Sequence, residues 1–498
     1  MLRHSILANF AGQAWTAVIG LLVLPVYVRV LGIEAYGLIG FFLSLQALFS
    51  IFDMGMSATL NRELARHLHS GAESDLQRDL VRTLEWLYWP IGLLIAAGVF
   101  AVSGVLAQDW LRPVTLGTDR AAHAIAVLGL TAGLQWPCGF YAGGFRGLER
   151  HVALNVLNAI FATLRHVGAA GVLLLVSPTL EAFVWWQALI SGLQTVVLAY
   201  ELWRALPAGT RTPMFRANLL WQLSDFALGV TGIAFLSFVL MQSDRLIMST
   251  VLPLSEFGYY TLAATVAAAL STLVQPFFAA LYPRYSGLVA TGQNLRLVNL
   301  YHTSNQLLAP VVLSAASVVA LFSFEVLQLL TGDPKVAAAS GPILTILVCG
   351  TALNGLMHLP HALQLAHGWT RLALAQNLIL VLVVVPATWW LGNRFGGLGA
   401  ALVWLTLNLV FVVVSVPLMH RRLLRGELGR WYLRAVLPPA LAAGIVAGVL
   451  RLALPTIPGG IAGIAVLLVV TAITMACAGL ASPAARAQAV RALSVFAS

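Results

Sequence analysis

The chain has 498 residues, of which 60% are hydrophobic and only 9% are charged, and its mean hydropathy is +0.89. A soluble domain carries about 25% charged residues, so this composition excludes a water-soluble globular protein. The formal net charge of +10 is compatible with nucleic-acid binding. The basic residues, however, lie in loops between apolar segments, which points to membrane topology and anionic lipid headgroups and away from nucleic acid.

Apolar segments of about 20 residues recur along the whole chain, and that length crosses about 30 Å of hydrocarbon. Because each segment must satisfy its own backbone hydrogen bonds in the membrane, helices are predicted. The first segment is expected to be an uncleaved helix, since no small-residue cleavage site follows it. The fourteen predicted spans are 8–30, 36–58, 84–107, 121–143, 152–176, 180–202, 225–247, 257–282, 303–328, 339–365, 371–391, 397–419, 435–454 and 459–480. The sequence therefore predicts an all-α polytopic membrane protein.

The loops between these spans carry their basic residues unevenly. With a cytoplasmic N-terminus, twenty arginines fall in inside segments, and only five basic residues fall outside: Arg112, Arg120, Lys335, Arg394 and Arg451. The positive-inside rule thus predicts that both termini are cytoplasmic, in a bacterial inner membrane. The outer loops are short, and the longest, about Gln108–Arg120, cannot form a catalytic domain.

An internal repeat divides the chain. Residues 30–37 (VLGIEAYG) resemble residues 251–258 (VLPLSEFG), and Arg62 and Arg284 lie 222 positions apart at the inner ends of spans two and eight. Such near-constant offsets predict two six-helix lobes with parallel topology, an arrangement common in transporters. The predicted domains are an N-lobe at 1–205, a C-lobe at 206–420 and a C-terminal helix pair with its tail at 421–498.

Several motifs carry a resemblance to a known family. They are Leu31-Gly32, Tyr36-Gly37-Leu38, Asp53-Met54-Gly55, Asn61-Arg62-Glu63-Leu64-Ala65, Asp244-Arg245 and Phe257-Gly258-Tyr259. Together they resemble the polysaccharide-transporter (Wzx-type) flippases of the multidrug/oligosaccharidyl-lipid/polysaccharide exporter superfamily. The resemblance implies two lobes that move a polyprenyl-diphosphate-linked oligosaccharide outward by alternating access, with membrane lipids and the polysaccharide polymerase machinery as further partners. No motif identifies the sugar.

Arginines are the natural ligands of an anionic diphosphate, because the guanidinium stays charged and binds phosphate oxygens in pairs. Arg165 is the leading candidate, since it lies near the middle of span five on a stripe with Asn155 and Asn158. A purely structural ion pair between two helices is the alternative reading. Four further arginines at span ends are candidates for loading or release, with ordinary membrane anchoring as the alternative: Arg62, Arg284, Arg29 and Arg245.

Other polar residues of the spans are candidates for cavity lining or ion coupling. Asn9 in span one and Asn354, His358 and His361 in span ten could contact sugar, although a packed histidine pair is the alternative. No cofactor is expected and no metal site is predicted, but uphill transport needs H⁺ or Na⁺. The candidate acidic residues for that coupling are Asp53, Asp225, Asp244 and Glu325; for Asp53, a structural cap is the alternative.

Two competing functions remain. A drug or metabolite exporter of the same superfamily, coupled to H⁺ or Na⁺, would favour an acidic residue in span one, which has none. A membrane enzyme of polysaccharide assembly would need a water-facing catalytic platform, and neither a large outer loop nor a nucleophile–base set is present in the sequence. The chain is therefore predicted to be a transporter and not an enzyme.

Overall fold

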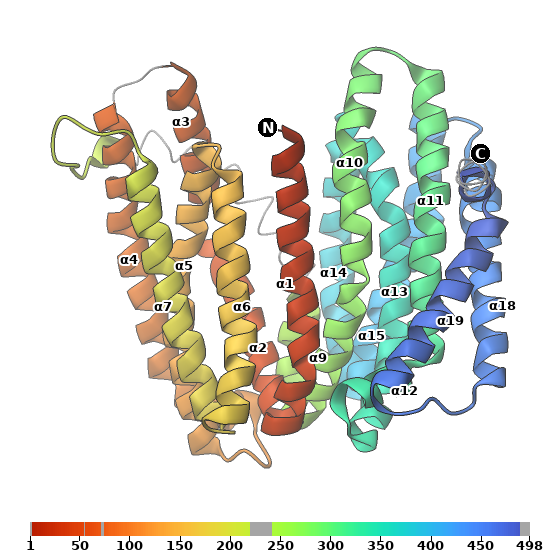
Figure 1. Ribbon diagram of the computed structural model, residues 1–498, viewed down its shortest axis with the longest axis horizontal. Helices are drawn as coiled ribbons and strands as arrows, with labels where there is room; N and C mark the ends of the chain where they lie inside the picture. Colours follow the sequence, from red (N-terminus) through yellow and green to blue (C-terminus); the bar gives the residue numbers. More distant parts are fainter. Residues whose placement is uncertain (1, 54, 71–73, 220–241, 489–498) are drawn as a thin grey trace. The chain divides into compact units, whose positions relative to one another are not determined.

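Helices dominate because nearly every segment is apolar enough to lie in a membrane. The computed structural model describes residues 2–53, 55–70, 74–219 and 242–488, and within these ranges every regular element is a helix. Eleven of the described helices are long and apolar enough to cross a membrane, and Val18–Leu31 and Ile33–Phe49 are shorter apolar helices. The prediction of an all-α, multi-pass membrane protein is confirmed (Figure 1).

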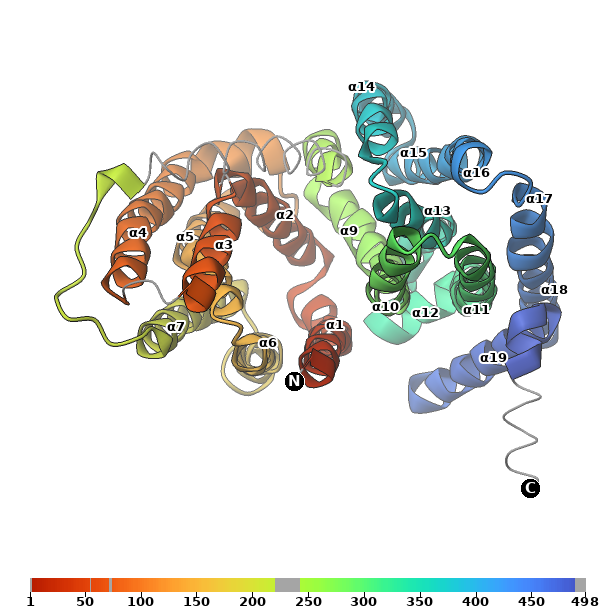
Figure 2. The same ribbon diagram turned by 90° about the horizontal axis from the view of Figure 1, so that it is seen from above.

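The described residues form two compact units, Met1–Gly258 and Tyr259–Ser498. The helices of the first unit are α1 (Leu2–Leu31), α2 (Ile33–Phe49), η1 (Ser50–Asp53), α3 (Met56–Ser70), α4 (Ser74–Val105), η2 (Leu106–Leu111), α5 (Thr118–Gly147), α6 (His151–Leu175) and α7 (Leu180–Ala205). Helix α9 (Leu254–Ala269) begins in unit 1 and continues into unit 2. Within unit 1, α5 packs against both α4 and α7, as the view from above shows (Figure 2).

The second unit continues from α9. Its helices are α10 (Ser271–Ala290), α11 (Asn294–Leu321), α12 (Ser323–Thr331), α13 (Pro334–Ala366), α14 (Thr370–Phe395), α15 (Gly397–Val410), η3 (Phe411–Ser415), α16 (Val416–Leu423), α17 (Leu428–Arg430), η4 (Trp431–Val436), α18 (Leu437–Ala453) and α19 (Gly460–Ala481). Helices α18 and α19 pack on each other and on α11 (Figure 2).

The number of spans stays a prediction. Predicted span seven, 225–247, lies largely outside the described residues, and predicted spans one and two correspond only in part to helices of spanning length. The predicted domain boundaries also stay predictions, because the division into units follows contacts and not the repeat.

Predicted span two is where the structure differs from a continuous helix. Helix α2 ends at Phe49, η1 follows, and α3 begins only at Met56. The equivalent place in the second half is Leu270, between α9 and α10 and 221 positions after Phe49, but its backbone angles stay helical, with φ −59° and ψ −32°. The first half of the chain therefore breaks this helix, whereas the second half continues through the equivalent place as one span, Leu254–Ala290.

The core of unit 1 is built where α4, α5 and α7 meet. Its largest buried side chains include Tyr88, Phe140, Tyr141 and Phe145. Farther along the same pair of helices, α4 and α5 approach closely at two glycines, since a Cβ added at Gly133 would lie 2.3 Å from the carbonyl oxygen of Gly92. Small residues at such crossings let helix backbones pack closely inside a membrane.

Candidate functional site

The interruption of predicted span two brings irregular backbone next to an acidic side chain. Gly55 adopts a positive φ of 70°, a conformation that glycine enters at little cost, and the chain restarts as α3. Asp53 accepts a hydrogen bond from the backbone N–H of Ser57 at 3.3 Å, so its carboxylate caps the first turn of α3. The capping role considered from the sequence is therefore present. Discontinuous helices of this kind form substrate and ion sites in many transporters.

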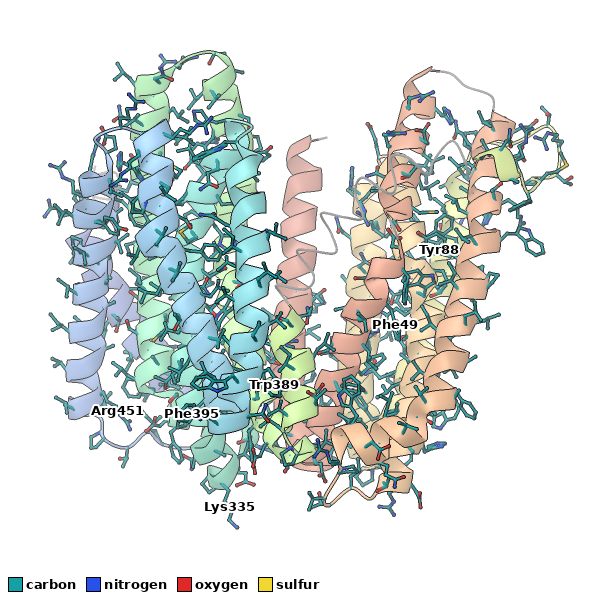
Figure 3. All side chains as sticks on the ribbon, turned by 180° about the vertical axis from the view of Figure 1, so that it is seen from behind. Phe49, Tyr88, Lys335, Trp389, Phe395 and Arg451 are labelled. Atoms are coloured by element: carbon teal, nitrogen blue, oxygen red, sulfur yellow. The ribbon has the colours of Figure 1, made fainter. Side chains whose placement is uncertain are left out.

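A polar pocket opens beside this interruption, and we call it the Asp53 pocket. Its volume is about 520 Å³, and it lies between α2, η1, α3 and α5 of unit 1. Its lining residues are Leu43, Gln46, Ala47, Phe49, Ser50, Asp53, Ser57, Ala132, Gln135, Trp136, Gly139 and Arg146. Figure 3 labels Phe49, at the end of α2, and Tyr88, on α4, near the middle of the helices of this unit. The pocket therefore extends from this level, at Phe49, to the last turn of α5, at Arg146.

The carboxylate of Asp53 is held by neighbours that leave it facing the pocket. It accepts hydrogen bonds from the hydroxyls of Ser57 and Tyr88. Tyr88 is itself fixed, because its buried ring stacks on Phe140 and Trp136 at centroid distances of 4.7 and 5.8 Å. Three hydrogen bonds thus hold this carboxylate in place on the wall of the pocket.

The opposite wall of the Asp53 pocket comes from α5. The side-chain amides of Gln46 and Gln135 meet across the pocket at 2.5 Å. Arg146, in the last turn of α5, is exposed and donates through Nε to the carbonyl of Ala142 at 3.2 Å. Within the described part of the chain, Arg146 makes no ion pair. One wall thus carries the carboxylate and the amide of Gln46, and the other carries the guanidinium and the amide of Gln135.

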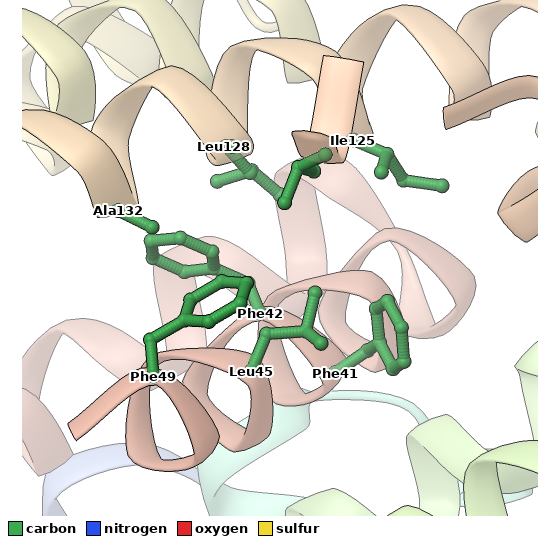
Figure 4. A pocket seen from close by; sticks show the side chains of 9 residues that line it. Phe41, Phe42, Leu45, Phe49, Ile125, Leu128 and Ala132 are labelled. Atoms are coloured by element: carbon green, nitrogen blue, oxygen red, sulfur yellow. The ribbon is translucent and has the colours of Figure 1, made fainter. Parts of the chain in front are cut away.

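An apolar pocket adjoins the polar one. Figure 4 shows Phe41, Phe42 and Leu45 of α2 facing Ile125 and Leu128 of α5. The two pockets share Phe49 and Ala132. This apolar pocket has a volume of only about 10 Å³, so it has room for no more than a water-sized group.

Arg165, the leading candidate from the sequence, lies on α6 of the same unit and does not line the Asp53 pocket. Its Nη2 donates to Oε1 of Gln194 at 2.7 Å, and its buried Nε has no hydrogen-bond partner. Among the described residues it forms no ion pair, so the structural ion pair considered for it is not seen. On the same helix, Asn155 is half-buried and Asn158 is exposed.

The other candidate arginines are scattered. Arg62 on α3 is exposed and pairs with the neighbouring Glu63 at 2.7 Å, while Arg284 on α10 is also exposed. Arg29 is exposed in the last turn of α1, and Arg245 is half-buried. None of these four lines the Asp53 pocket, so their roles remain predictions.

The other three acidic candidates for ion coupling are Glu325, Asp244 and Asp225. Oε1 of Glu325 on α12 lies 2.5 Å from Nη1 of Arg451 on α18, an ion pair within unit 2; Arg451 lies at the same end of this unit as Lys335 (Figure 3). This pairing supports a structural role for Glu325. Asp244 is half-buried. Asp225 lies outside the described residues, as does the side chain of Asn9.

The polar face of predicted span ten is largely occupied by protein partners. Asn354 donates to the side chain of Asn408 at 2.8 Å, and Nδ1 of His358 lies 3.0 Å from the carbonyl oxygen of Asn354. His361 is half-buried one turn later. This bonding favours the packed-histidine alternative, and the sugar-binding role of these residues remains a prediction.

Most residues of the Asp53 pocket were not predicted from the sequence. Gln46 and Gln135 carried a usable signal, since each is an uncharged polar residue within an apolar span. Arg146 was counted only as a topological residue of an inside segment. Tyr88 carried no signal, because a tyrosine near a span end is typical of membrane interfaces.

Known proteins share this architecture. The lipid II flippase MurJ in an inward-closed conformation has a TM-score of 0.70 at 10% identity, with 95% of this chain and 98% of that chain covered. An inward-facing multidrug resistance MATE family transporter of the MOP superfamily has a TM-score of 0.63 at 14% identity, with 84% and 96% covered. These likenesses show the fold, which is that of the MOP superfamily.

Sequence relatives agree with the fold. The "Putative O-antigen transporter" of Shigella flexneri is 22% identical over 404 residues, which cover 80% of this chain and 92% of that protein. The family model described as "Polysaccharide biosynthesis protein" matches residues 2–289, more than half of the chain. The resemblance stated from the sequence is thereby confirmed, and the chain belongs to the polysaccharide biosynthesis protein family.

Proposed function

We propose that this protein is a flippase that translocates a polyprenyl-diphosphate-linked oligosaccharide from the cytoplasmic to the outer leaflet by alternating access. It would act in the bacterial inner membrane with both termini in the cytoplasm and deliver its product to the polysaccharide polymerase machinery. The family, the name of the Shigella relative and the MOP fold support a transporter of lipid-linked saccharides. None of these comparisons points to an enzyme.

The observation that carries this proposal is the position of Arg146. Its guanidinium lies on the wall of a pocket of about 520 Å³ and, within the described residues, has no carboxylate partner. An unpaired guanidinium attracts a diphosphate and binds it with charge-assisted hydrogen bonds. The amides of Gln46 and Gln135, which line the same pocket, suit sugar hydroxyls, because an amide both donates and accepts.

Arg165 is proposed as a second cation for the diphosphate within unit 1. Its guanidinium has one protein acceptor, Gln194, and a buried Nε that is free to donate. A cation without a carboxylate partner inside a membrane is costly and is a functional candidate for that reason. Arg62, Arg284, Arg29 and Arg245 remain proposed phosphate contacts at the ends of their helices.

The test measures flipping of a fluorescent polyprenyl-diphosphate oligosaccharide in proteoliposomes. Arg146→Ala and Arg165→Ala should each slow flipping by about tenfold to a hundredfold, the effect of losing about 1.5–3 kcal/mol of charge-assisted hydrogen bonding. The lysine variants should recover part of the rate. Arg204→Ala is the matched control, since Arg204 is an exposed arginine of unit 1 that pairs with Glu201 at 3.8 Å.

Normal flipping by both alanine variants would exclude the proposed diphosphate contacts.

A second candidate function, export of drugs or metabolites coupled to H⁺ or Na⁺, is favoured by the carboxylate of Asp53 facing the pocket. If the wild-type protein moves no lipid-linked saccharide and exports small organic cations under a proton or sodium gradient, this second function replaces the first.

A further inference from the structure

A second cavity of unit 1 shares no lining residue with the Asp53 pocket. It is a groove of about 440 Å³ between α4, α5 and α7, which we call the Arg82 groove. Its lining includes Arg82, Trp86, Trp89, Leu93, Tyr141 and Val196. The four residues from α4 recur every three or four positions, so they form one stripe about 16 Å long on that helix.

The greater part of the Arg82 groove is apolar and open to the surface. Trp86 and Leu93 are each 65% exposed, and Val196 of α7 is 58% exposed. Exposed side chains of this kind on membrane-spanning helices face hydrocarbon. Water would find few hydrogen-bond partners in the apolar stretch of the groove, so an acyl chain is the occupant that this stretch favours.

One end of the groove is charged. Arg82 donates to Glu85 at 3.0 Å, and the buried Glu85 also accepts hydrogen bonds from Tyr141 at 2.9 Å and from Trp203 at 2.7 Å. The carboxylate is thus occupied by protein donors. The guanidinium of Arg82 remains partly exposed, with its side chain 43% accessible.

A second cation lies beside the first. The guanidinium carbons of Arg82 and Arg78 lie 4.9 and 5.3 Å from the ring centroid of Trp203. Arg78 makes no ion pair with any residue that the structure describes. Only Arg82 pairs with Glu85, while Arg78 donates to the carbonyl oxygen of Pro207 at 3.2 Å. The two guanidinium groups beside Trp203 thus outnumber the one carboxylate of the groove, so this end is net positive and attracts an anion.

We propose that the Arg82 groove binds one anionic glycerophospholipid, with its phosphate at Arg82 and an acyl chain along Trp86, Leu93 and Val196. Tryptophans next to basic side chains are typical of the headgroup level of a membrane. The charged end of the groove lies near the start of α4, which the arginine distribution assigns to the cytoplasmic side. This site is independent of the proposed transport function, and its test requires no substrate.

The experiment places the full-length protein in phosphatidylcholine nanodiscs with a low fraction of phosphatidylglycerol that carries a diazirine on one acyl chain. After illumination, labelled peptides are mapped by mass spectrometry, and label is expected on the 86–93 segment of α4 and near Val196. Val196→Phe should lower this labelling about tenfold, the change in affinity expected when about two methylene groups are displaced from an apolar site. Leu189→Phe is the control, since Leu189 is exposed on α7 and does not line the groove.

The charged end is tested separately. Arg82→Gln can still donate to Glu85 but loses its charge, so labelling by phosphatidylglycerol should fall several-fold to the level of diazirine-phosphatidylcholine, and Arg82→Lys should retain the preference. Equal labelling of the wild-type and Val196→Phe proteins would overturn the proposal. So would labelling of the groove by a diazirine polyprenyl phosphate at concentrations where phosphatidylglycerol gives none, because the groove would then hold an isoprenoid chain.

Discussion

Asp53 has more hydrogen-bond donors than a simple helix cap needs. The backbone N–H and hydroxyl of Ser57 would suffice to start α3, yet the hydroxyl of Tyr88 on a different helix also donates to the carboxylate. This third donor ties α3 to α4 through a group that faces the pocket. A proton or a sodium ion binding at Asp53 would compete with these donors, and the α3–α4 connection would change as a result.

We predict that Asp53→Asn abolishes any dependence of transport on a proton or sodium gradient. The amide has no charge to exchange with a cation, but it fits the same space and can still accept from Ser57, so the protein should fold. Flipping in proteoliposomes with and without an imposed gradient measures the effect. Asp109→Asn is the control, because Asp109 is an exposed acid of the same unit. Retained gradient dependence in Asp53→Asn would place the coupling elsewhere.

Some functional candidates of unit 1 could be identified from the sequence, and others could not. Asp53 and Arg165 stood out because a charge inside an apolar span is costly and therefore rare. Tyr88 and Arg146 did not, since nothing in a linear pattern says that α4 and the end of α5 lie beside η1. Their importance depends on helix packing, which hydropathy does not encode. In the same way, the pairing of Glu325 with Arg451 could not be predicted from residues 126 positions apart.

At the scale of elements, hydropathy predicted the existence of the helices better than their continuity. The predicted range 36–58 contains an interruption at Ser50–Gly55, whereas in the range 257–282 only Leu270, whose backbone angles stay helical, separates α9 from α10. Apolar side chains continue through both places, so hydropathy alone predicts one continuous helix in each range. The local signal in the first case was Asp53 followed by Gly55, which favours a turn.

The glycines of the repeated motif, Gly37 and Gly258, are explained by close packing. A Cβ added at Gly37 would lie 2.6 Å from the carbonyl oxygen of Leu254, and one at Gly258 would lie 2.3 Å from that of Ile33. The segments 30–37 and 251–258, which the repeat aligns, therefore pack backbone against backbone at their glycines. Any larger residue at either glycine would separate the two helix starts.

The ion pair of Glu325 and Arg451 should anchor α18 to α12. We predict that Arg451→Ala lowers the free energy of unfolding by about 1–3 kcal/mol, because it leaves a buried carboxylate without its partner. The additional change Glu325→Gln should recover part of this loss, since a neutral amide costs less to bury. Thermal unfolding of the purified protein measures both effects as shifts in Tm.

The control for this ion pair is Lys335→Ala. Lys335 is exposed and lies at the same end of unit 2 (Figure 3), so its loss should leave the Tm within about 1 °C, as for most surface substitutions. If the double variant is no more stable than Arg451→Ala alone, the two side chains do not interact energetically and the pair is only a geometric contact.

For the whole molecule, the distribution of basic residues makes the firmest prediction. Each unit has one end rich in arginine, and the positive-inside rule assigns that end to the cytoplasm. Four exposed positions sample both ends of both units: Arg120 and Lys335 on the predicted outer side, and Arg204 and Arg296 on the predicted inner side. Single cysteines at these positions, in a variant whose three native cysteines are replaced by alanine, report the side directly.

We predict that a membrane-impermeant maleimide labels cysteines at 120 and 335 in intact cells with a permeable outer envelope, and labels those at 204 and 296 only after the inner membrane is opened. The two units supply independent results, so agreement between them would establish that both lobes have the same orientation, as a parallel repeat requires. Opposite labelling of the two units would mean an inverted repeat. In that case the number of crossings between Arg204 and Arg296 would be odd, whereas the parallel repeat predicts two crossings there, spans seven and eight.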